Sequence, residues 1–229
     1  MLLNLINGSG DMRSYVMGLL LSLPIILLAL SLHETAHGYV AYRLGDPTAR
    51  NLGRLTLNPI KHLDPIGFLC MLFAGFGWAN PVPINTRNFK NPRRDLALSA
   101  AAGPASNLLL ALLFTALYKV FLLVVPNLRF TEASYDTAVI VVNIVAQFIC
   151  LGISLNVSLA VFNLLPVPPL DGSRLFYVFL PPKYYFGVMK YERYISLGIM
   201  ILLLVGVLDP VLSFVRGGII NLFFLIFGI

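Results

Sequence analysis

Two histidines and a glutamate stand close together in the sequence His33-Glu34-Thr35-Ala36-His37. On a helix, residues four apart share a face, so His33 and His37 can direct their imidazoles at one metal ion. Glu34 lies beside them without being needed as a ligand. In metal-assisted hydrolysis, zinc lowers the pKa of a bound water molecule and a neighbouring carboxylate takes the proton. The pattern therefore predicts a zinc hydrolase in which Glu34 is the general base.

The motif lies within a stretch that is long and apolar enough to cross a lipid bilayer. Leu, Ile, Val and Ala dominate residues 14–40, and we expect a first membrane-spanning helix over about 14–43. An ionisable side chain at that depth costs at least about 2.5 kcal/mol, so its presence needs a reason. The alternative is that the histidines only hydrogen-bond to neighbouring helices, and this alternative leaves Glu34 without a task.

A catalytic zinc ion keeps three protein ligands and one open position, so the two histidines need a third partner. Asp171 is the best candidate, because it follows a proline-rich segment, residues 166–169, on the side of the membrane where the first span ends. An ordinary turn at 171–172, or an ion pair with Arg174, explains the same residues without a metal. His62, the remaining histidine, is the second candidate.

The composition is that of a polytopic membrane protein. Of the 229 residues, 58% are hydrophobic and only 11% are charged, and the mean hydropathy is +0.84. No polar segment is long enough for a soluble domain, so we expect one membrane-embedded domain over residues 1–229, with its core at about 14–180 and C-terminal hydrophobic segments at 194–229. The net charge of +6 resides mainly in short loops, where it determines topology and does not indicate nucleic-acid binding.

The apolar runs predict an all-α helical bundle of about four to six membrane segments. Besides the first span, residues 96–125 and 137–165 are long enough to cross the bilayer. The second of these runs carries five polar residues that we expect to face the protein interior: Asn143, Gln147, Asn156, Ser158 and Asn163. Residues 194–229, broken at Asp209-Pro210, form either two short spans or one span and an interfacial helix.

Three shorter segments complete the expected architecture. Residues 66–78 are too few to span the bilayer and predict a re-entrant or interfacial segment with a bend at 75–77, preceded by Asp64 as an N-cap. Partial alternation at 53–57 suggests a short strand, and the proline-rich residues 80–85 suggest an edge strand.

Lys and Arg are divided unequally between two sets of loops. Twelve lie within residues 43–95 and 171–193, whereas Arg13, Lys119 and Arg129 lie in the opposite loops. Positively charged loops remain in the cytoplasm, so the first span ends on the cytoplasmic side. His33 is about 15 Å of helix from that end, which predicts an active site near the cytoplasmic side of an integral membrane protein.

Six short motifs follow one another along about residues 30–180: HETAH at 33–37, GRLTLNP at 53–59, DPIG at 64–67, NPVPIN at 80–85, AGPASN at 102–107 and NLLPVPPLDG at 163–172. Together they resemble the site-2 protease family of intramembrane zinc metalloproteases. The resemblance implies one zinc ion per chain, with three ligands: His33, His37 and Asp171. It implies that Glu34 is the general base and that Asn163 positions the substrate or stabilises the developing oxyanion.

The resemblance also implies a small membrane-embedded β-sheet formed by the segments at 53–57 and 80–85. Many bacterial relatives insert a PDZ domain between core helices, and this chain has none, so it resembles the compact subgroup. The expected activity is cleavage of a transmembrane segment in single-span membrane proteins, such as membrane-anchored anti-sigma factors or remnant signal peptides, in the cell membrane of a prokaryote. Arg54 and Asn85 are further candidates for contacts near the cleft, with structural roles as the alternative.

Two other functions use the same residues. An inactive relative that acts as a membrane scaffold is one alternative, and the intact motif argues against it. A metal-binding transporter is the other, because it also places His and Asp at membrane depth. Against a transporter, the motif occurs once, the sequence shows no internal repeat, and transport has no use for Glu34.

Overall fold

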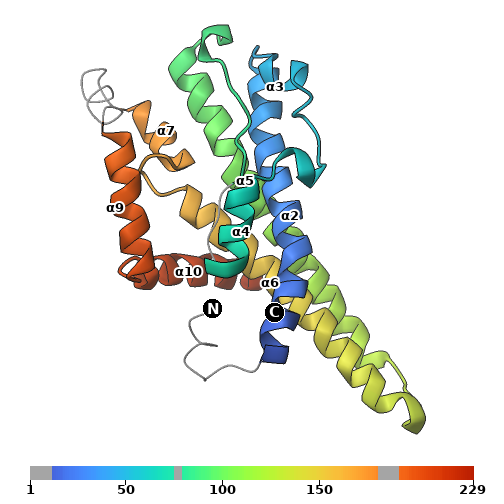
Figure 1. The fold of residues 1–229 in the computed structure, drawn as a ribbon. Coiled ribbons are helices and arrows are strands. Elements are labelled where there is room, and N and C mark those ends of the chain that lie inside the picture. Colours follow the sequence, from blue (N-terminus) through green and yellow to red (C-terminus); the bar gives the residue numbers. More distant parts are fainter. Residues whose placement is uncertain (1–11, 75–78, 180–190) are drawn as a thin grey trace.

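The computed structural model describes residues 12–74, 79–179 and 191–229, and the chain in these ranges is mostly helical (Figure 1). Within these ranges, four helices are long and apolar enough to cross a membrane. They are α2 (Met12–Arg43), α5 (Pro92–Val124), α6 (Tyr135–Asn163) and α10 (Asp209–Phe227). The prediction of an α-helical membrane bundle is thereby confirmed.

Shorter elements connect the long helices. Among the described residues they are α3 (Thr48–Asn51), α4 (Pro65–Ala74), α7 (Asp171–Tyr177), α9 (Glu192–Leu204), and the 3-10 turns η1 (Pro59–Lys61), η2 (Thr86–Asn88), η3 (Val125–Asn127) and η4 (Glu132–Ser134). Helix α4 begins as expected, because Oδ1 of Asp64 accepts a hydrogen bond from the backbone N–H of Gly67 at 2.7 Å. The expected bend at 75–77 lies outside the described residues.

Helices α2, α5 and α6 pack together and form the hydrophobic core (Figure 1). The buried side chains at their contacts form one cluster: Ala29, Leu110, Ala111, Phe114, Ile149, Ile153, Val157 and Val161. Gly152 of α6 makes the close contact with α5 possible, because a Cβ atom there would lie 2.5 Å from Cδ1 of Phe114. The Phe114 ring fills this space and makes a T-shaped contact with Phe148, with centroids 6.1 Å apart.

The polar face of α6 differs in part from the prediction. Asn156 is fully buried, as expected, but Asn143 and Gln147 are exposed. The shape of the bundle gives the reason: α5 and α6 continue beyond α2 as a two-helix hairpin (Figure 1), and Gln147 faces an open cavity of about 580 Å³ between α6 and the beginning of α2. The prediction that these two amides face the interior was therefore wrong.

The C-terminal helix α10 lies across α5 and α6 (Figure 1). Its Phe224 stacks on Tyr118 of α5, with ring centroids 6.0 Å apart. The Lys119 ammonium donates to the carbonyl oxygen of Gly228 at 2.7 Å, which places a cation at the negative, C-terminal end of the α10 dipole. Of the two C-terminal helices, α10 has the length of a span, whereas α9 has only 13 residues.

The expected β-sheet is absent from the described residues. Residues 53–57 follow α3 as irregular chain, residues 80–85 are extended without forming a strand, and an isolated bridge joins Leu63 to Ala79. The prediction of two strands was wrong for these segments.

The chemistry of the two segments explains why no ladder forms. Pro81 and Pro83 have no backbone N–H to contribute to a sheet. The carbonyl oxygen of Asn80 accepts instead from the Arg54 guanidinium, with Nη2 at 2.6 Å. Side-chain hydrogen bonds therefore replace the backbone pairing that alternation and motif resemblance suggested.

The close approach of α5 and α6 makes a testable prediction about packing. We expect Gly152→Ala to lower the apparent melting temperature of the purified protein by several degrees, because the added methyl group has to displace the Phe114 ring, and overpacking a core costs about 1–3 kcal/mol. Gly198→Ala in α9 is the matched control, since a Cβ atom there meets nothing within 4 Å. Equal melting temperatures for the two variants in a thermal unfolding assay would contradict this packing.

Candidate metal centre

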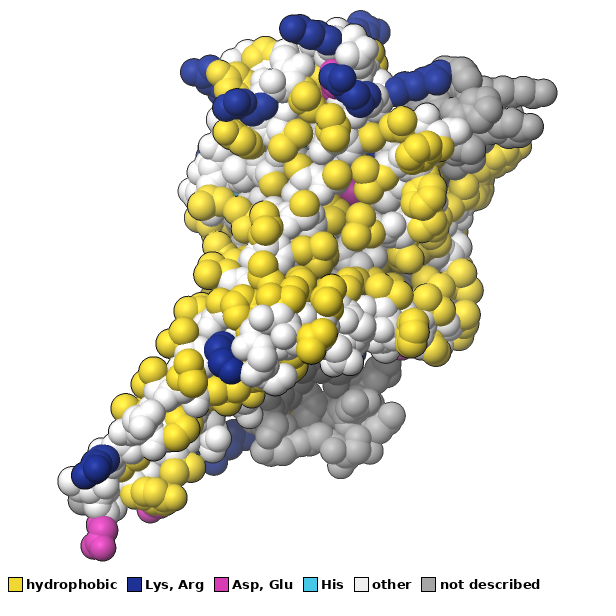
Figure 2. Space-filling view, turned by 180° about the vertical axis from the view of Figure 1, so that it is seen from behind, with side chains coloured by type: hydrophobic (Ala, Val, Ile, Leu, Met, Phe, Trp, Pro, Cys, Tyr) yellow, Lys and Arg dark blue, Asp and Glu magenta, His cyan; other side chains and the backbone are white. Residues whose placement is uncertain are grey.

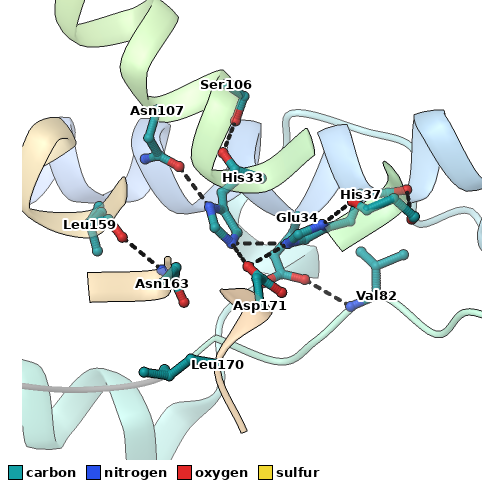
Figure 3. A network of polar contacts seen from close by, with 12 residues as sticks. His33, Glu34, His37, Val82, Ser106, Asn107, Leu159, Asn163, Leu170 and Asp171 are labelled. Atoms are coloured by element: carbon teal, nitrogen blue, oxygen red, sulfur yellow. Dashed lines mark hydrogen bonds and ion pairs between the residues drawn. The ribbon is translucent and has the colours of Figure 1, made fainter. Parts of the chain in front are cut away.

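Three buried side chains from two helices converge on one point. His33 and His37 lie one turn apart on α2, and Asp171 is the first residue of α7 (Figure 3). The two Nε2 atoms are 3.0 Å apart, and each lies 3.1 Å from Oδ2 of Asp171. The exposed fraction of each of these residues is 9% or less. The structure thus brings together the three residues that the sequence suggested as ligands.

The outer nitrogens of both imidazoles are held by hydrogen-bond acceptors. Nδ1 of His33 lies 2.6 Å from Oδ1 of Asn107, and Nδ1 of His37 lies 2.7 Å from the carbonyl oxygen of Ser99. Because these oxygens can only accept, both Nδ1 atoms carry the hydrogen, and both Nε2 atoms present a lone pair. Orientation of ligand histidines by such partners is typical of metal sites.

The Asn107 amide is itself fixed by a second amide. Its Nδ2 donates to Oδ1 of Asn156 at 3.2 Å, and Nδ2 of Asn156 donates to the carbonyl oxygen of Gly152 at 2.8 Å. Both amides are fully buried. This chain of hydrogen bonds connects α6 through α5 to the imidazole of His33, and it assigns the Asn107 oxygen to the imidazole side.

Glycines allow the helices to approach the centre closely. A Cβ atom on Gly103 of α5 would lie 2.4 Å from Nε2 of His37, so the two imidazoles pack directly on the α5 backbone. A Cβ atom on Gly172 would lie 2.3 Å from the carbonyl oxygen of Leu164, so Gly172 lets α7 begin against the end of α6. The Asp-Gly pair at 171–172 therefore serves packing as well as the placement of the carboxylate.

The Glu34 carboxylate lies beside the cluster and contacts the segment at 80–85. Its Oε2 accepts a hydrogen bond from the backbone N–H of Val82 at 2.9 Å (Figure 3). Glu34 follows His33 directly, so the two side chains are about 100° apart around α2. Glu34 therefore lies next to His33, His37 and Asp171 but is not one of the three residues that could hold a metal ion.

The other residues proposed from the sequence occupy different places. Asn163, at the end of α6, donates from Nδ2 to the carbonyl oxygen of Leu159 at 2.9 Å. His62 is buried outside the cluster, with Nε2 at 2.7 Å from the carbonyl oxygen of Thr56. No hydrogen bond or ion pair joins Arg174 to Asp171 among the described residues, so the alternatives of a His62 ligand and an Asp171–Arg174 pair find no support.

A cavity of about 250 Å³ lies beside the cluster. Its wall is formed by α2, α6, α7 and the segment at 79–84, and the residues that carry chemistry line it: His33, Glu34, His37, Asn163, Asp171 and Arg174. Asn163 therefore shares a cavity with the cluster, although its amide contacts its own helix.

The donor set fits a zinc ion. The three atoms lie within 4.8 Å of one another, and two imidazole nitrogens with a carboxylate oxygen are ligands that zinc takes in hydrolytic sites. At zinc–ligand bonds of about 2.0–2.1 Å in tetrahedral geometry, neighbouring ligand atoms are roughly 3.3 Å apart, close to the separations found here. Two imidazole lone pairs and a carboxylate that face each other also repel unless a cation lies between them.

Apolar helices of membrane-spanning length around a buried His-His-Asp cluster define a membrane protein with the metal centre of a hydrolase. The model of peptidase family M50 matches residues 21–207, so the chain belongs to this family, the site-2 proteases. The protein is a zinc metalloprotease. As expected for the compact subgroup, no PDZ domain lies between the described helices.

Curated relatives agree with this assignment. A protein of Bacillus subtilis named "Putative zinc metalloprotease YwhC" is 43% identical over 208 residues, which cover 88% of this chain and 90% of the relative. The Rip2 protein of Mycolicibacterium smegmatis, which carries the same description, is 31% identical over 201 residues, 86% of this chain and 71% of the relative. The Rip2 protein of Mycobacterium tuberculosis is 29% identical over 189 residues, which cover 80% of this chain and 66% of the relative. No solved structure matches the chain.

Sequence reasoning found the three clustered residues and missed those that orient them. Asn107 ends the AGPASN motif at 102–107 and Ser99 lies just before it, but this motif entered the sequence interpretation only as part of the family resemblance. An amide eight residues after a serine is the available signal, since positions about two turns apart lie on the same face of a helix. The partner helix and the atoms contacted follow only from the fold.

The contact between Asn107 and His33 makes a testable prediction. We expect Asn107→Ala to weaken zinc binding by about 10- to 100-fold, because the His33 ring loses the acceptor that fixes its orientation and tautomer. The measurement is a zinc titration against a competing chelator. Asn143→Ala, which removes an exposed amide on α6, is the control and should retain the affinity of the wild type. Equal affinities for both variants would show that Asn107 has no influence on the metal.

Proposed function

We propose that this protein is an intramembrane zinc metalloendopeptidase that cleaves a transmembrane segment of single-span membrane proteins. The observation that carries the proposal is the arrangement in α2: two imidazole lone pairs and the Asp171 carboxylate face one another, and the Glu34 carboxylate lies beside them in the same cavity. His33, His37 and Asp171 would hold the zinc ion. When bound, zinc polarises a carbonyl group and lowers the pKa of a water molecule.

Glu34 is the general base in this proposal. Its Oε2 is engaged by the Val82 N–H, which leaves Oε1 as the acceptor for the proton of the attacking water. The same carboxyl group then passes a proton to the leaving amine. A carboxylate with one oxygen held and one available has a fixed orientation, which is the condition for efficient proton transfer.

The substrate has to unwind before it can be cut, because the carbonyl groups of a membrane helix are already hydrogen-bonded within that helix. The segment at 80–85 forms part of the cavity wall and is extended. Its prolines donate no hydrogen bonds, so the segment offers mainly carbonyl acceptors to an unwound peptide. We propose that it holds the substrate by pairing with the substrate's backbone N–H groups.

Asn163 lines the same cavity and is the proposed donor to the developing oxyanion. Its Nδ2 donates to a carbonyl oxygen of its own helix in the present arrangement. The proposal therefore requires the side chain to turn toward the substrate. A donor placed at an oxyanion contributes about 100- to 1,000-fold to kcat in hydrolases.

Charge distribution and the relatives support a location in a prokaryotic cell membrane with the active site near the cytoplasm. Lys and Arg side chains gather at one end of the molecule, and hydrophobic side chains cover its middle (Figure 2). The basic end contains Arg43, where α2 terminates, and the relatives described above are bacterial. Candidate substrates are membrane-anchored anti-sigma factors and remnant signal peptides, which are single-span proteins of this membrane.

The role of Glu34 is tested with purified protein and a fluorescently tagged single-span helix. We expect the wild type to cut the helix, and Glu34→Gln to retain about one zinc ion per chain while losing at least about 1,000-fold in kcat, because the amide cannot accept the proton. Zinc is quantified in both samples. If both proteins bind zinc and neither cuts any helix in a broad panel, the site serves transport or scaffolding, and the protease mechanism is wrong.

The role of Asn163 is tested separately. We expect Asn163→Ala to lower kcat by about 100-fold with KM and zinc content close to those of the wild type, because a donor to the transition state is lost while substrate binding is kept. Steady-state cleavage of the same tagged helix gives both constants, and Asn143→Ala on the same helix is the control. A variant with unchanged kcat would remove Asn163 from the mechanism.

A further inference from the structure

The segment that carries Val82 is attached to the rest of the protein mainly by charged side chains. We call residues 80–88 the clamped segment. Arg54 donates from Nη2 to the carbonyl oxygens of Asn80 at 2.6 Å and Pro81 at 3.3 Å. Glu34 accepts from the Val82 N–H at 2.9 Å. These contacts hold the first half of the segment against α2 and the chain that follows α3.

Asp46 holds the second half of the clamped segment. Its Oδ2 accepts from the backbone N–H of Asn85 at 2.7 Å, and its Oδ1 accepts from Nδ2 of Asn88 at 2.7 Å. The same carboxylate also accepts from the backbone N–H and the hydroxyl group of Thr48. Asp46 is fully buried, and both of its carboxylate oxygens accept hydrogen bonds from these three residues.

The charge of Asp46 is matched to this environment. Burial alone raises the pKa of this carboxyl, but the hydrogen bonds from Thr48, Asn88 and Asn85 outweigh burial and hold its pKa below the ordinary value. The group is therefore ionised at neutral pH. An ionised carboxylate with four donors is a strong and specific anchor for the backbone that it binds.

Besides these side chains, one backbone hydrogen bond, from the Asn80 N–H to the carbonyl oxygen of His62 at 2.7 Å, holds the start of the clamped segment. Pro81 and Pro83 cannot donate, so Val82 is the sole backbone donor between them. No strand forms in the described part of this region, and the neighbouring bridge joins Leu63 to Ala79, outside the clamped segment. The Val82 side chain approaches α2 where a Cβ atom on Gly38 would lie 3.0 Å from its Cγ1. A small shift of the segment would therefore move the Val82 N–H away from Glu34.

We propose that Asp46 is a positioning residue for the hydrolytic reaction, because it fixes the clamped segment so that the Val82 N–H holds the Glu34 carboxylate in its working orientation. The proposal rests on the proposed role of Glu34 as the general base. Asp46 touches neither the substrate nor the clustered metal donors, and it acts through the backbone at residues 82–85. The held orientation also keeps Glu34 from turning onto the metal as an additional ligand.

The first test separates kcat from KM. Asp46→Asn keeps the shape of the side chain, but its amide nitrogen faces a donor, so at least one of the four hydrogen bonds is lost. We expect kcat for the tagged single-span helix to fall at least 10-fold, with zinc content within about twofold of the wild type. KM rises by a smaller factor than kcat falls, because the same segment is proposed to hold the substrate. Asn88→Ala, which removes one exposed partner of Asp46, should give a smaller loss of kcat and provides a milder variant if Asp46→Asn does not fold.

Asp95→Asn is the matched control. Asp95 is also a buried carboxylate, and it accepts from the Asn91 N–H at 3.0 Å and from Arg94 at 2.9 Å, outside the clamped segment. We expect this variant to lower the melting temperature and to leave kcat within about twofold of the wild type. Equal losses of kcat in Asp46→Asn and Asp95→Asn would show a general loss of stability and would overturn the proposal.

The second test does not depend on cleavage. In residues 80–85, three backbone N–H groups donate in defined bonds: Asn80 to His62, Val82 to Glu34 and Asn85 to Asp46. In hydrogen–deuterium exchange, we expect Glu34→Ala, which removes the acceptor, to speed exchange at Val82 alone, and Asp46→Asn to speed it at both Val82 and Asn85. Protection of Val82 that persists in Asp46→Asn would overturn the proposal. A wild type that cuts no helix would instead overturn the proposed function, and with it the catalytic role of Asp46, whatever the exchange pattern shows.

Discussion

The convergence of two imidazole lone pairs and a carboxylate inside an apolar bundle is the constraint on which the rest of the structure depends. Two imidazole lone pairs and a carboxylate within about 3 Å of one another repel where water is scarce, and a metal ion between them turns this repulsion into attraction. The surrounding elements serve this requirement. Helix α5 supplies the acceptors for the outer imidazole nitrogens, α6 fixes the Asn107 amide, and Gly103 lets the imidazoles lie directly on the α5 backbone.

Helix α2 presents the histidines on one face and Glu34 on another, and different parts of the protein orient the side chains of each face. His33 and His37 face α5 and Asp171, whereas Glu34, about 100° further around the helix, faces the clamped segment. The metal donors are therefore oriented by amides within the membrane helices, and the proposed base is oriented by a segment anchored at Asp46. A change in the contacts of Glu34 can therefore leave the contacts of the metal donors intact. Such a change lowers kcat without lowering zinc content.

Local pattern was sufficient for the spans and for the two histidines, whereas the choice of Asp171 over its alternatives came from the family resemblance. Hydropathy places α2, α5 and α6 within a few residues, since membrane helices satisfy their own backbone. His33 and His37 are four residues apart, so their proximity follows from the helix alone. The strands were wrong because Pro81 and Pro83 prevent a ladder and because the Arg54 side chain takes the carbonyl groups instead. The role of Asp46 does not follow from local pattern: it accepts from Thr48, two residues further on, but its contacts with Asn85 and Asn88 span about 40 residues and depend on the tertiary fold.

The central claim is that one zinc ion is held by two histidines and one carboxylate in this cluster. X-ray absorption at the zinc edge, measured on purified wild type loaded with one equivalent of zinc, tests it most directly. The account predicts only nitrogen and oxygen neighbours at about 2.0–2.2 Å, with the outer scattering of two imidazoles. Sulfur neighbours at about 2.3 Å, or the outer scattering of fewer than two imidazoles, would contradict it.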